Sequence, residues 1–288
     1  MTRRALIAGV ARDCGAHLSG VFANLERIAA CYDEVSFCFV ENDSTDDTQA
    51  QLAQFGRGRP SFHLFNLDGL GQLPIRTLRL EYARNLYLSF ARTNPAVAHC
   101  DELVVIDMDD AGGFPIDPDQ FAIARARLDQ DAGLAGVFAN QRGLYYDLWA
   151  LRAAGWCPDD VWLAMAQACM EPGVTEEMAY DRVMAPRVRA IDPSSPLIEV
   201  DSAFGGLGIY RLSALRASTA TYHGAQMHAL PISGNGLAII RMQCCEHVAL
   251  NRGLRAAGHR LCIDPGLVNR LMPSSARFPP GAFRSMMF

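Results

Sequence analysis

The chain has 288 residues and a mass of 31.5 kDa, enough to bury a substantial core, and its net charge of −5 gives no electrostatic footprint for nucleic acid. All 26 basic residues are arginines, which excludes enzymes that need a lysine, such as Walker-type phosphate loops, Schiff-base enzymes and pyridoxal-phosphate enzymes. No apolar stretch approaches the ~18 residues of a membrane span, no secretory signal is recognisable, and nine scattered cysteines without a Cys-x-x-Cys pair favour reduced thiols in the cytoplasm.

The first 110 residues alternate between short apolar runs and stretches with helical spacing of apolar residues. Strands are expected at residues 5–10, 35–40, 62–65 and 103–106, and helices at residues 17–31 and 77–92. Ser44 or Thr45 is expected to cap a further helix after the second strand. Because strand–helix–strand units make right-handed parallel connections, this half predicts an α/β fold with a parallel sheet.

Three carboxylates, Asp107, Asp109 and Asp110, directly follow the fourth predicted strand. In open α/β sheets the ligand crevice lies at the carboxyl ends of the strands. Carboxylates at that edge are hard oxygen ligands suited to Mg²⁺ or Mn²⁺ carrying a phosphorylated substrate. A solvated acidic turn is the alternative interpretation of the same residues.

Other polar residues follow the second and third strands. Glu41, Asn42 and Asp43 are well placed to accept hydrogen bonds from a base or a ribose, and Asp68 follows the third strand. Arg84 interrupts the apolar stripe of the helix at residues 77–92, although surface arginines are most often solvated.

The second half of the chain has a less regular pattern. Strands are expected at residues 136–140, 207–210 and 259–264, a helix from Cys244 to Ala257, and mixed helix and loop over residues 156–195. Gly205 and Gly206 permit close approach of the backbone to a ligand. The last 15 or so residues are open to two interpretations, a mobile lid or a simple tail.

Four stretches, in chain order, resemble motifs of the GT-A glycosyltransferases. Residues 41–48 (ENDSTDDT) resemble the nucleotide-binding loop, residues 107–110 (DMDD) the D-x-D motif, residues 200–211 the glycine loop beside the donor sugar, and residues 245–265 the x-E-D helix with its trailing segment. Residues 145–152 (YYDLWALR) are further similar to the mannosyltransferases of the Cap59-like group.

This resemblance implies a GT-A-like fold, with a Rossmann-type, mostly parallel central sheet flanked by helices. It implies a single catalytic domain over residues 1–288, in which residues 1–110 bind the nucleotide sugar and residues 111–288 bind the acceptor. The implied activity is a metal-dependent hexosyltransferase that moves a sugar, with mannose as a candidate, from a nucleotide diphosphate sugar to a hydroxyl of a glycan or lipid-linked acceptor. Such an enzyme would use Mn²⁺ or Mg²⁺ in polysaccharide biosynthesis and would contact the inner face of a membrane peripherally, through its C-terminal segment.

The resemblance also assigns roles to residues of this chain. Asp107 and Asp109 would bind the metal, and Asp147 and Trp149 would bind the acceptor, because an aromatic face beside a carboxylate suits a sugar; a buried core Trp is the alternative. The donor would be bound by Ala8, Arg12, Glu41, Asn42, Asp43, Asp68, Arg84, Asp107, Gly205 and Gly206.

The catalytic candidates are Glu246, His247 and Asp201. Where many inverting relatives carry an aspartate as general base, this chain has His247 after Glu246. Four alternatives remain. Glu246 is the base, His247 is the base, the enzyme is retaining and needs no such base, or His247 binds the metal with Asp109.

Two other classes compete with this interpretation. A nucleotidyltransferase shares a similar sheet and a carboxylate-bound metal, but the loop at residues 9–15 has only Arg12 with which to grip a triphosphate. A non-catalytic carbohydrate-binding protein would bind sugar regardless of Mn²⁺.

Overall fold

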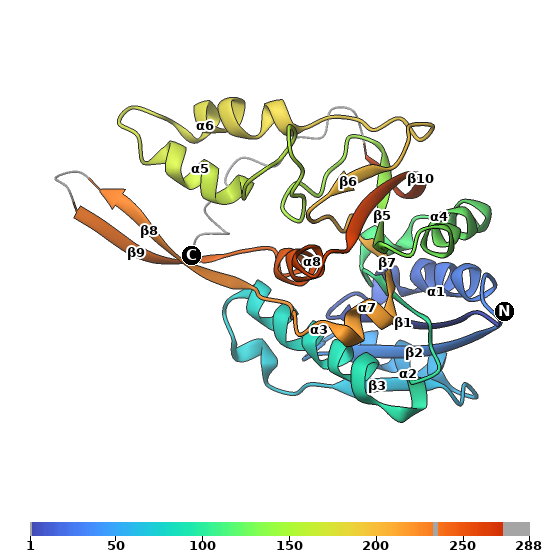
Figure 1. The fold of residues 1–288 in the computed structure, drawn as a ribbon. Coiled ribbons are helices and arrows are strands. Elements are labelled where there is room, and N and C mark those ends of the chain that lie inside the picture. Colours follow the sequence, from blue (N-terminus) through green and yellow to red (C-terminus); the bar gives the residue numbers. More distant parts are fainter. Residues whose placement is uncertain (1, 233–235, 273–288) are drawn as a thin grey trace.

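The computed structural model describes residues 2–232 and 236–272, and in this part of the chain a central sheet of eight strands lies between layers of helices (Figure 1). The strand order is β3-β2-β1-β4-β7-β5-β10-β6. The strands of this sheet are β1 (Arg4–Ala11), β2 (Glu34–Glu41), β3 (Phe62–Asn66), β4 (Glu102–Ile106), β5 (Leu134–Gly143), β6 (Ile198–Val200), β7 (Leu207–Arg211) and β10 (Arg260–Met272). The helices are α1 (Gly15–Ala29), α2 (Thr48–Gly56), α3 (Arg76–Thr93), α4 (Pro118–Gln130), α5 (Val161–Cys169), α6 (Glu176–Val183), α7 (Leu212–Ala217) and α8 (His247–Ala256).

The first half of the chain forms the expected parallel sheet. β1 pairs in parallel with both β2 and β4, and β2 pairs in parallel with β3. The expected strands and helices of this half agree with the observed ones to within two residues. The capping prediction is wrong, because α2 begins at Thr48, after Ser44 and Thr45, and Ser44 instead accepts a hydrogen bond from the backbone N–H of Asp13 at 3.0 Å.

The second half adds two antiparallel strands to the sheet. β7 lies antiparallel between β4 and β5, and β6 lies antiparallel to β10. The mostly parallel α/β sheet is therefore confirmed, with β7 placing its first residue beside the last residue of β4: Leu207 pairs with Ile106. β10 runs to Met272, well beyond the expected end at residue 264, and the predicted lid or tail falls mainly on residues 273–288, outside the described part of the chain.

Alternating side chains of the central strands build a core on each face of the sheet. On one face, Ile7 and Val104 pack with α1 and α4 residues such as Leu25 and Phe121. On the other face, Leu6 and Leu103 pack with residues of α3 and α8, and the buried surfaces of α5 and α7 join the same cluster. Burial on both faces explains why β1 and β4 read as continuous apolar runs in the sequence.

A two-stranded antiparallel hairpin, β8 (Ala225–Ile232) and β9 (Gly236–Gln243), stands apart from the central sheet. It projects from the body of the molecule next to the end of α3 (Figure 1). The sequence analysis did not predict it. Within residues 2–232 and 236–272, no helix combines the length and the hydropathy that crossing a bilayer requires.

Candidate active site

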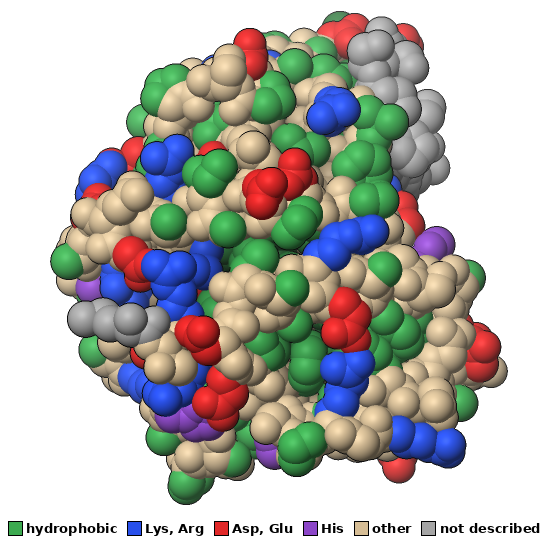
Figure 2. All heavy atoms as spheres, turned by 90° about the vertical axis from the view of Figure 1, so that its right-hand side faces the viewer, with side chains coloured by type: hydrophobic (Ala, Val, Ile, Leu, Met, Phe, Trp, Pro, Cys, Tyr) green, Lys and Arg blue, Asp and Glu red, His purple; other side chains and the backbone are tan. Residues whose placement is uncertain are grey.

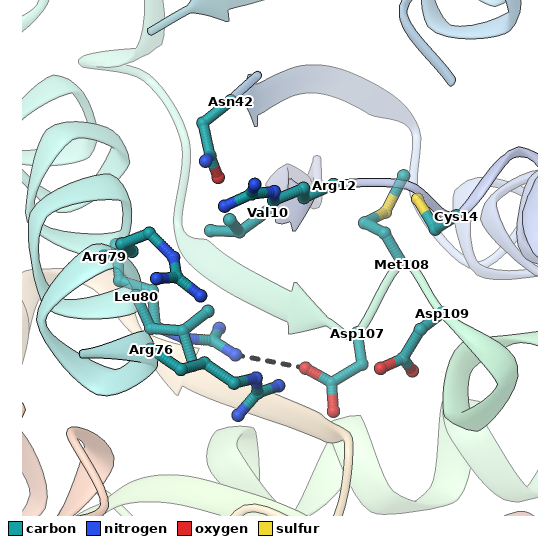
Figure 3. Close-up of a pocket in the computed structure, with 11 residues that line it drawn as sticks. Val10, Arg12, Cys14, Asn42, Arg76, Arg79, Leu80, Asp107, Met108 and Asp109 are labelled. Carbon is teal, nitrogen blue, oxygen red and sulfur yellow. Dashed lines mark hydrogen bonds and ion pairs between the residues drawn. The ribbon is translucent and has the colours of Figure 1, made fainter. Parts of the chain in front are cut away.

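The carboxyl ends of β1, β2 and β4 surround a pocket whose opposite wall is α3 (Figure 3). The segments that directly follow these strands supply Arg12, Asn42, Asp107 and Asp109, because parallel neighbours end at the same edge of the sheet. The residues that line the pocket are Val10, Arg12, Cys14, Asn42, Arg76, Arg79, Leu80, Arg84, Asp107, Met108 and Asp109. This lining combines four guanidinium groups with two carboxylates, which suits a ligand that carries several negative charges together with a cation.

Arg84 joins three elements of this site. Its Nη2 donates to Oδ1 of Asp107 at 3.1 Å (dashed in Figure 3), and its Nε donates to Oε1 of Glu246 at 2.8 Å. Its Nη1 donates to the hydroxyl of Tyr87 at 3.3 Å, and that hydroxyl donates to Tyr222. The Arg84 side chain is only 5% exposed, so α3, the end of β4 and the start of α8 are held together by a buried cation, each of whose three nitrogens donates a hydrogen bond.

Asp107 and Asp109 lie side by side at the end of β4, with their carboxylates turned into the same space (Figure 3). Burial raises the pKa of Asp107, and the nearby Arg84 only partly offsets this effect. Removal from solvent, together with the charge of Asp107, also raises the pKa of Asp109. The charged forms of these two neighbouring carboxylates are both disfavoured, and a divalent cation bound between them would stabilise those charged forms.

The glycine loop is fixed against these carboxylates. The backbone N–H of Asp107 donates to Gly206 O at 2.9 Å, and a Cβ added at Gly206 would lie 3.4 Å from Oδ2 of Asp107. Gly206 has φ +87°, in the left-handed region that favours glycine. Asp147 accepts hydrogen bonds from the backbone N–H groups of Gly205 (2.8 Å) and Ala150 (3.2 Å), so its carboxylate positions this loop.

Glu246 and His247 stand at the start of α8 in different surroundings. Glu246 faces Arg84, and its second oxygen has no hydrogen bond to any described residue. His247 is 2% exposed, stacks on Phe204 with ring centroids 3.8 Å apart, and neither ring nitrogen has a hydrogen-bond partner in the described part of the chain. Burial, followed by the charge of Arg84, lowers the pKa of His247 well below its usual value, so its 3.7 Å contact with Glu246 is not an ion pair.

The loop after β2 has mainly structural contacts. Asn42 lines the pocket, whereas Glu41 accepts a hydrogen bond from the N–H of Ser44 at 2.8 Å. The Asp43 carboxylate accepts hydrogen bonds from the N–H groups of Gly69 and Gly71, and these bonds lower its pKa. This contact fixes the loop after β3 beside the pocket.

Several of the residues suggested from sequence do not line the pocket. Ala8 is fully buried within β1, and Asp68 is exposed after β3. Asp201 forms a surface ion pair with Arg255 at 3.1 Å. Trp149 is half-buried against the core, and its indole N–H has no partner among the described residues.

Arg76 and Arg79 line the pocket but were not among the site residues chosen from sequence. Arg76 extends from the first turn of α3 toward Asp107 (Figure 3), and it forms no hydrogen bond or ion pair with any described residue. The sequence contained a signal for them, because Arg76 and Arg79 are three positions apart and therefore lie next to each other on a helix.

No protein-family model matches the chain, and no curated protein matches it. Among solved structures, it is similar to the mannosyltransferase PcManGT from Pyrobaculum calidifontis in complex with GDP-Man and Mn²⁺, with a TM-score of 0.52 and 14% identity. That match covers 99% of this chain and 60% of the other, so the chain spans less than two thirds of that protein.

Two further solved structures match with lower scores. Residues 1–349 of S. aureus TarS match with a TM-score of 0.46 and 12% identity, covering 91% of this chain and 57% of that one. Glucosyl-3-phosphoglycerate synthase from Mycobacterium tuberculosis, in complex with UDP, matches with a TM-score of 0.40 and 13% identity, covering 99% and 76%. The similarity to the P. calidifontis structure establishes the fold, and the GT-A-like architecture expected from the sequence is confirmed.

The residues at the end of β4 fit a bound divalent cation. Asp107 keeps Oδ2 free of hydrogen bonds to described residues, and Asp109 lies beside it in the pocket. Within the described residues no third His, Cys, Asp or Glu completes a ligand set. Two carboxylates with the remaining positions left to substrate phosphates and water are the usual way in which proteins hold Mg²⁺.

Proposed function

We propose that the chain is a metal-dependent glycosyltransferase that moves a sugar from a nucleotide diphosphate sugar to a hydroxyl of a glycan or lipid-linked acceptor. The observation that carries this proposal is the Arg84 bridge: Arg84 lines the pocket and hydrogen-bonds both Asp107 of the D-x-D segment, which lines it too, and Glu246, which is buried next to it. Residues 1–110 would bind the donor and residues 111–288 would form the acceptor side.

The nucleotide would lie over the ends of β1 and β2, against Asn42 and Arg12. Asp107 and Asp109 would hold Mn²⁺ or Mg²⁺, which supplies Lewis-acid stabilisation of the departing diphosphate when bound. Arg76 and Arg79 would offset the remaining negative charge from the α3 side of the pocket. Gly206 would let the backbone approach the donor sugar beside Asp107.

Glu246 is the best candidate for accepting the proton of the acceptor hydroxyl in an inverting transfer. Arg84 holds one of its oxygens through a 2.8 Å hydrogen bond, and the other oxygen has no hydrogen bond to any described residue. His247 is less suited, because burial and the charge of Arg84 lower the pKa of its imidazole, which weakens it as a base.

Mannose is the first donor sugar to test. The P. calidifontis structure is named as a complex with GDP-Man and Mn²⁺, and residues 145–152 resemble the Cap59-like mannosyltransferases. An acceptor in cell-envelope polysaccharide biosynthesis and peripheral contact with a membrane belong to the same proposal.

A thermal-shift screen of nucleotide diphosphate sugars, each with and without Mn²⁺, tests this function. We expect one nucleotide class to raise the melting temperature only in the presence of Mn²⁺. Asp109→Asn should abolish the shift, whereas Asp110→Asn, next to it but paired with Arg270, should retain it. A shift with a nucleoside triphosphate alone would favour a nucleotidyltransferase, and sugar binding indifferent to Mn²⁺ would favour a carbohydrate-binding protein.

A further inference from the structure

The β8–β9 hairpin carries a row of apolar side chains that no other described element covers. Its register pairs Met227 with Arg241 and Ala229 with Ile239, so these side chains lie on the same face of the ribbon, and Leu237 follows on that face. Met227, Leu237 and Ile239 are 64%, 66% and 64% exposed. A contiguous group of large exposed apolar side chains usually marks a surface that binds something.

The charged residues of the hairpin are all basic. Residues 225–243 contain no aspartate or glutamate, and Arg241 lies on the apolar face, although the whole chain has a net charge of −5. An apolar face that carries a cation and no acidic residue matches the surface of an anionic bilayer, with acyl chains below and phosphate groups above.

The hairpin is anchored rigidly to the helix that forms the pocket wall. The hydroxyl of Thr77 donates to Gly224 O at 2.5 Å, and the carboxylate of Glu81 accepts from the N–H of Gly224 at 2.6 Å. The adjoining surface of α3 is an apolar groove lined by Leu73, Leu78, Glu81, Tyr82, Asn85 and Leu86. Tyr82 is 61% exposed there, and a tyrosine combines an apolar ring with a polar end in the way that membrane interfaces favour.

We propose that the exposed apolar face of the β8–β9 hairpin inserts into the surface of an anionic lipid bilayer. A second copy of the chain fits this face less well, because the same face of the second copy would bring no acidic side chain to Arg241. An anionic lipid headgroup supplies the negative charge that Arg241 lacks there. Each strand has eight residues, so the ribbon is on the order of 25 Å long, long enough to reach past the headgroups while the body stays in water.

This contact would bring a lipid-linked acceptor to the pocket, a consequence that rests on the proposed function. Glu246 follows the last residue of β9 by three positions, through Cys244 and Cys245. A hairpin held in the bilayer surface would therefore fix the start of α8, and the candidate base with it, close to the headgroup layer.

Vesicle flotation with the full chain, without nucleotide or metal, tests the proposal. The vesicles are phosphatidylcholine alone, or phosphatidylcholine mixed with phosphatidylglycerol in equal amounts. We expect the protein to float with the mixed vesicles and to bind them on the order of tenfold more weakly when Leu237→Gln and Ile239→Gln are combined. The matched control combines Ile123→Gln and Met178→Gln, two exposed apolar residues on α4 and α6, and should bind as the unchanged protein does.

Arg241→Gln should weaken binding to the mixed vesicles. It should leave binding to vesicles of phosphatidylcholine alone unchanged, because these carry no net charge. Failure of the unchanged protein to float at low salt would overturn the proposal. So would light scattering that shows a dimer which the Leu237 and Ile239 substitutions dissociate, because the face would then bind a second copy. The thermal shift with nucleotide sugar and Mn²⁺ should be the same in every variant, so loss of lipid binding is distinguished from failure of the transferase proposal.

Discussion

Two buried arginines lie at opposite ends of β4, and they differ in the charged groups that surround them. At the amino end, Arg125 pairs with Glu102 at 3.2 Å and with Asp129, and Tyr32 donates to the other oxygen of Glu102 at 2.6 Å. At the carboxyl end, Arg84 pairs with Asp107 and Glu246, each of which keeps one oxygen without a hydrogen bond to described residues.

The surroundings of the two arginines differ in the same way. Figure 2 shows the side of the molecule that carries the N-terminus, where acidic and basic side chains lie next to one another. Arg3, for example, pairs with Asp129 at 3.2 Å. Beside the Arg84 cluster, Arg76 and Asp109 face the pocket without such pairs. Each cluster lines a cavity, and Asp129 also keeps one oxygen without a hydrogen bond to described residues. The Arg84 cluster differs because an unpaired guanidinium and an unpaired carboxylate, those of Arg76 and Asp109, lie beside it in its pocket.

The largest expected difference between the two clusters is in activity, and Asp109→Asn should show it. Removing a carboxylate charge from the proposed metal site should lower kcat/KM by on the order of a thousandfold. Asp129→Asn, which alters the Arg125 cluster, should leave kcat/KM unchanged. Steady-state kinetics with the donor found in the thermal-shift screen measures both. Equal loss in the two variants would contradict the assignment.

Arg84→Met and Arg125→Met should each lower the free energy of unfolding by roughly 3–5 kcal/mol, because each leaves buried carboxylates without a counter-charge. The two variants should differ in their response to Mn²⁺. The cation should recover part of the stability of Arg84→Met, whose uncompensated Asp107 lies at the proposed metal site, and none of that of Arg125→Met. Urea titrations with and without Mn²⁺ measure this difference, and equal recovery in both would refute it.

Gly206→Ala should cost about 1–2 kcal/mol for its left-handed backbone. It should also weaken Mn²⁺ binding, because the new Cβ would lie 3.0 Å from Asn269 Nδ2 and 3.4 Å from Asp107 Oδ2, and relief of the closer contact shifts the glycine loop against Asp107. Gly258→Ala is a matched control, since Gly258 has φ +88° but no atom within 4 Å of its added Cβ. The control should lose stability alone. Calorimetric titration with Mn²⁺ and donor distinguishes the two, and unchanged affinity in Gly206→Ala would contradict the contact.

The smallest expected effect is that of His247→Leu on the pH dependence of the free energy of unfolding. Burial lowers the pKa of His247, so the unfolded chain binds a proton below about pH 6.5 that the folded chain does not, and stability falls as the pH drops. The variant should remove up to about 1.4 kcal/mol per pH unit from this slope. If His247→Leu keeps its fold but loses turnover, His247 is the base instead of Glu246.

The sequence was most informative where the local pattern and the tertiary structure agree. β1 to β4 and the helices between them are buried on predictable faces, so apolar runs and helical spacing located them within two residues. The same pattern placed Asp107 and Asp109 at the end of a buried strand, which the structure confirms.

Long-range pairing is what the pattern did not contain. Arg84 is buried because Glu246, 162 positions away, accepts its hydrogen bond, and helical spacing alone assigns an arginine to the solvent. The sequence of β7 is that of an ordinary apolar strand. Its antiparallel direction depends on the path of the chain before it, which local sequence does not indicate. The β8–β9 hairpin is apolar on an exposed face, which sequence rules associate with burial.

The most direct test is the position of Mn²⁺ in crystals grown with Mn²⁺ and a nucleoside diphosphate, located by its anomalous scattering. We expect a peak between the carboxylates of Asp107 and Asp109, with the diphosphate on the side of Arg76 and Arg79. A peak at Glu102 and Asp129, or none in the pocket while the nucleotide is bound there, would contradict it.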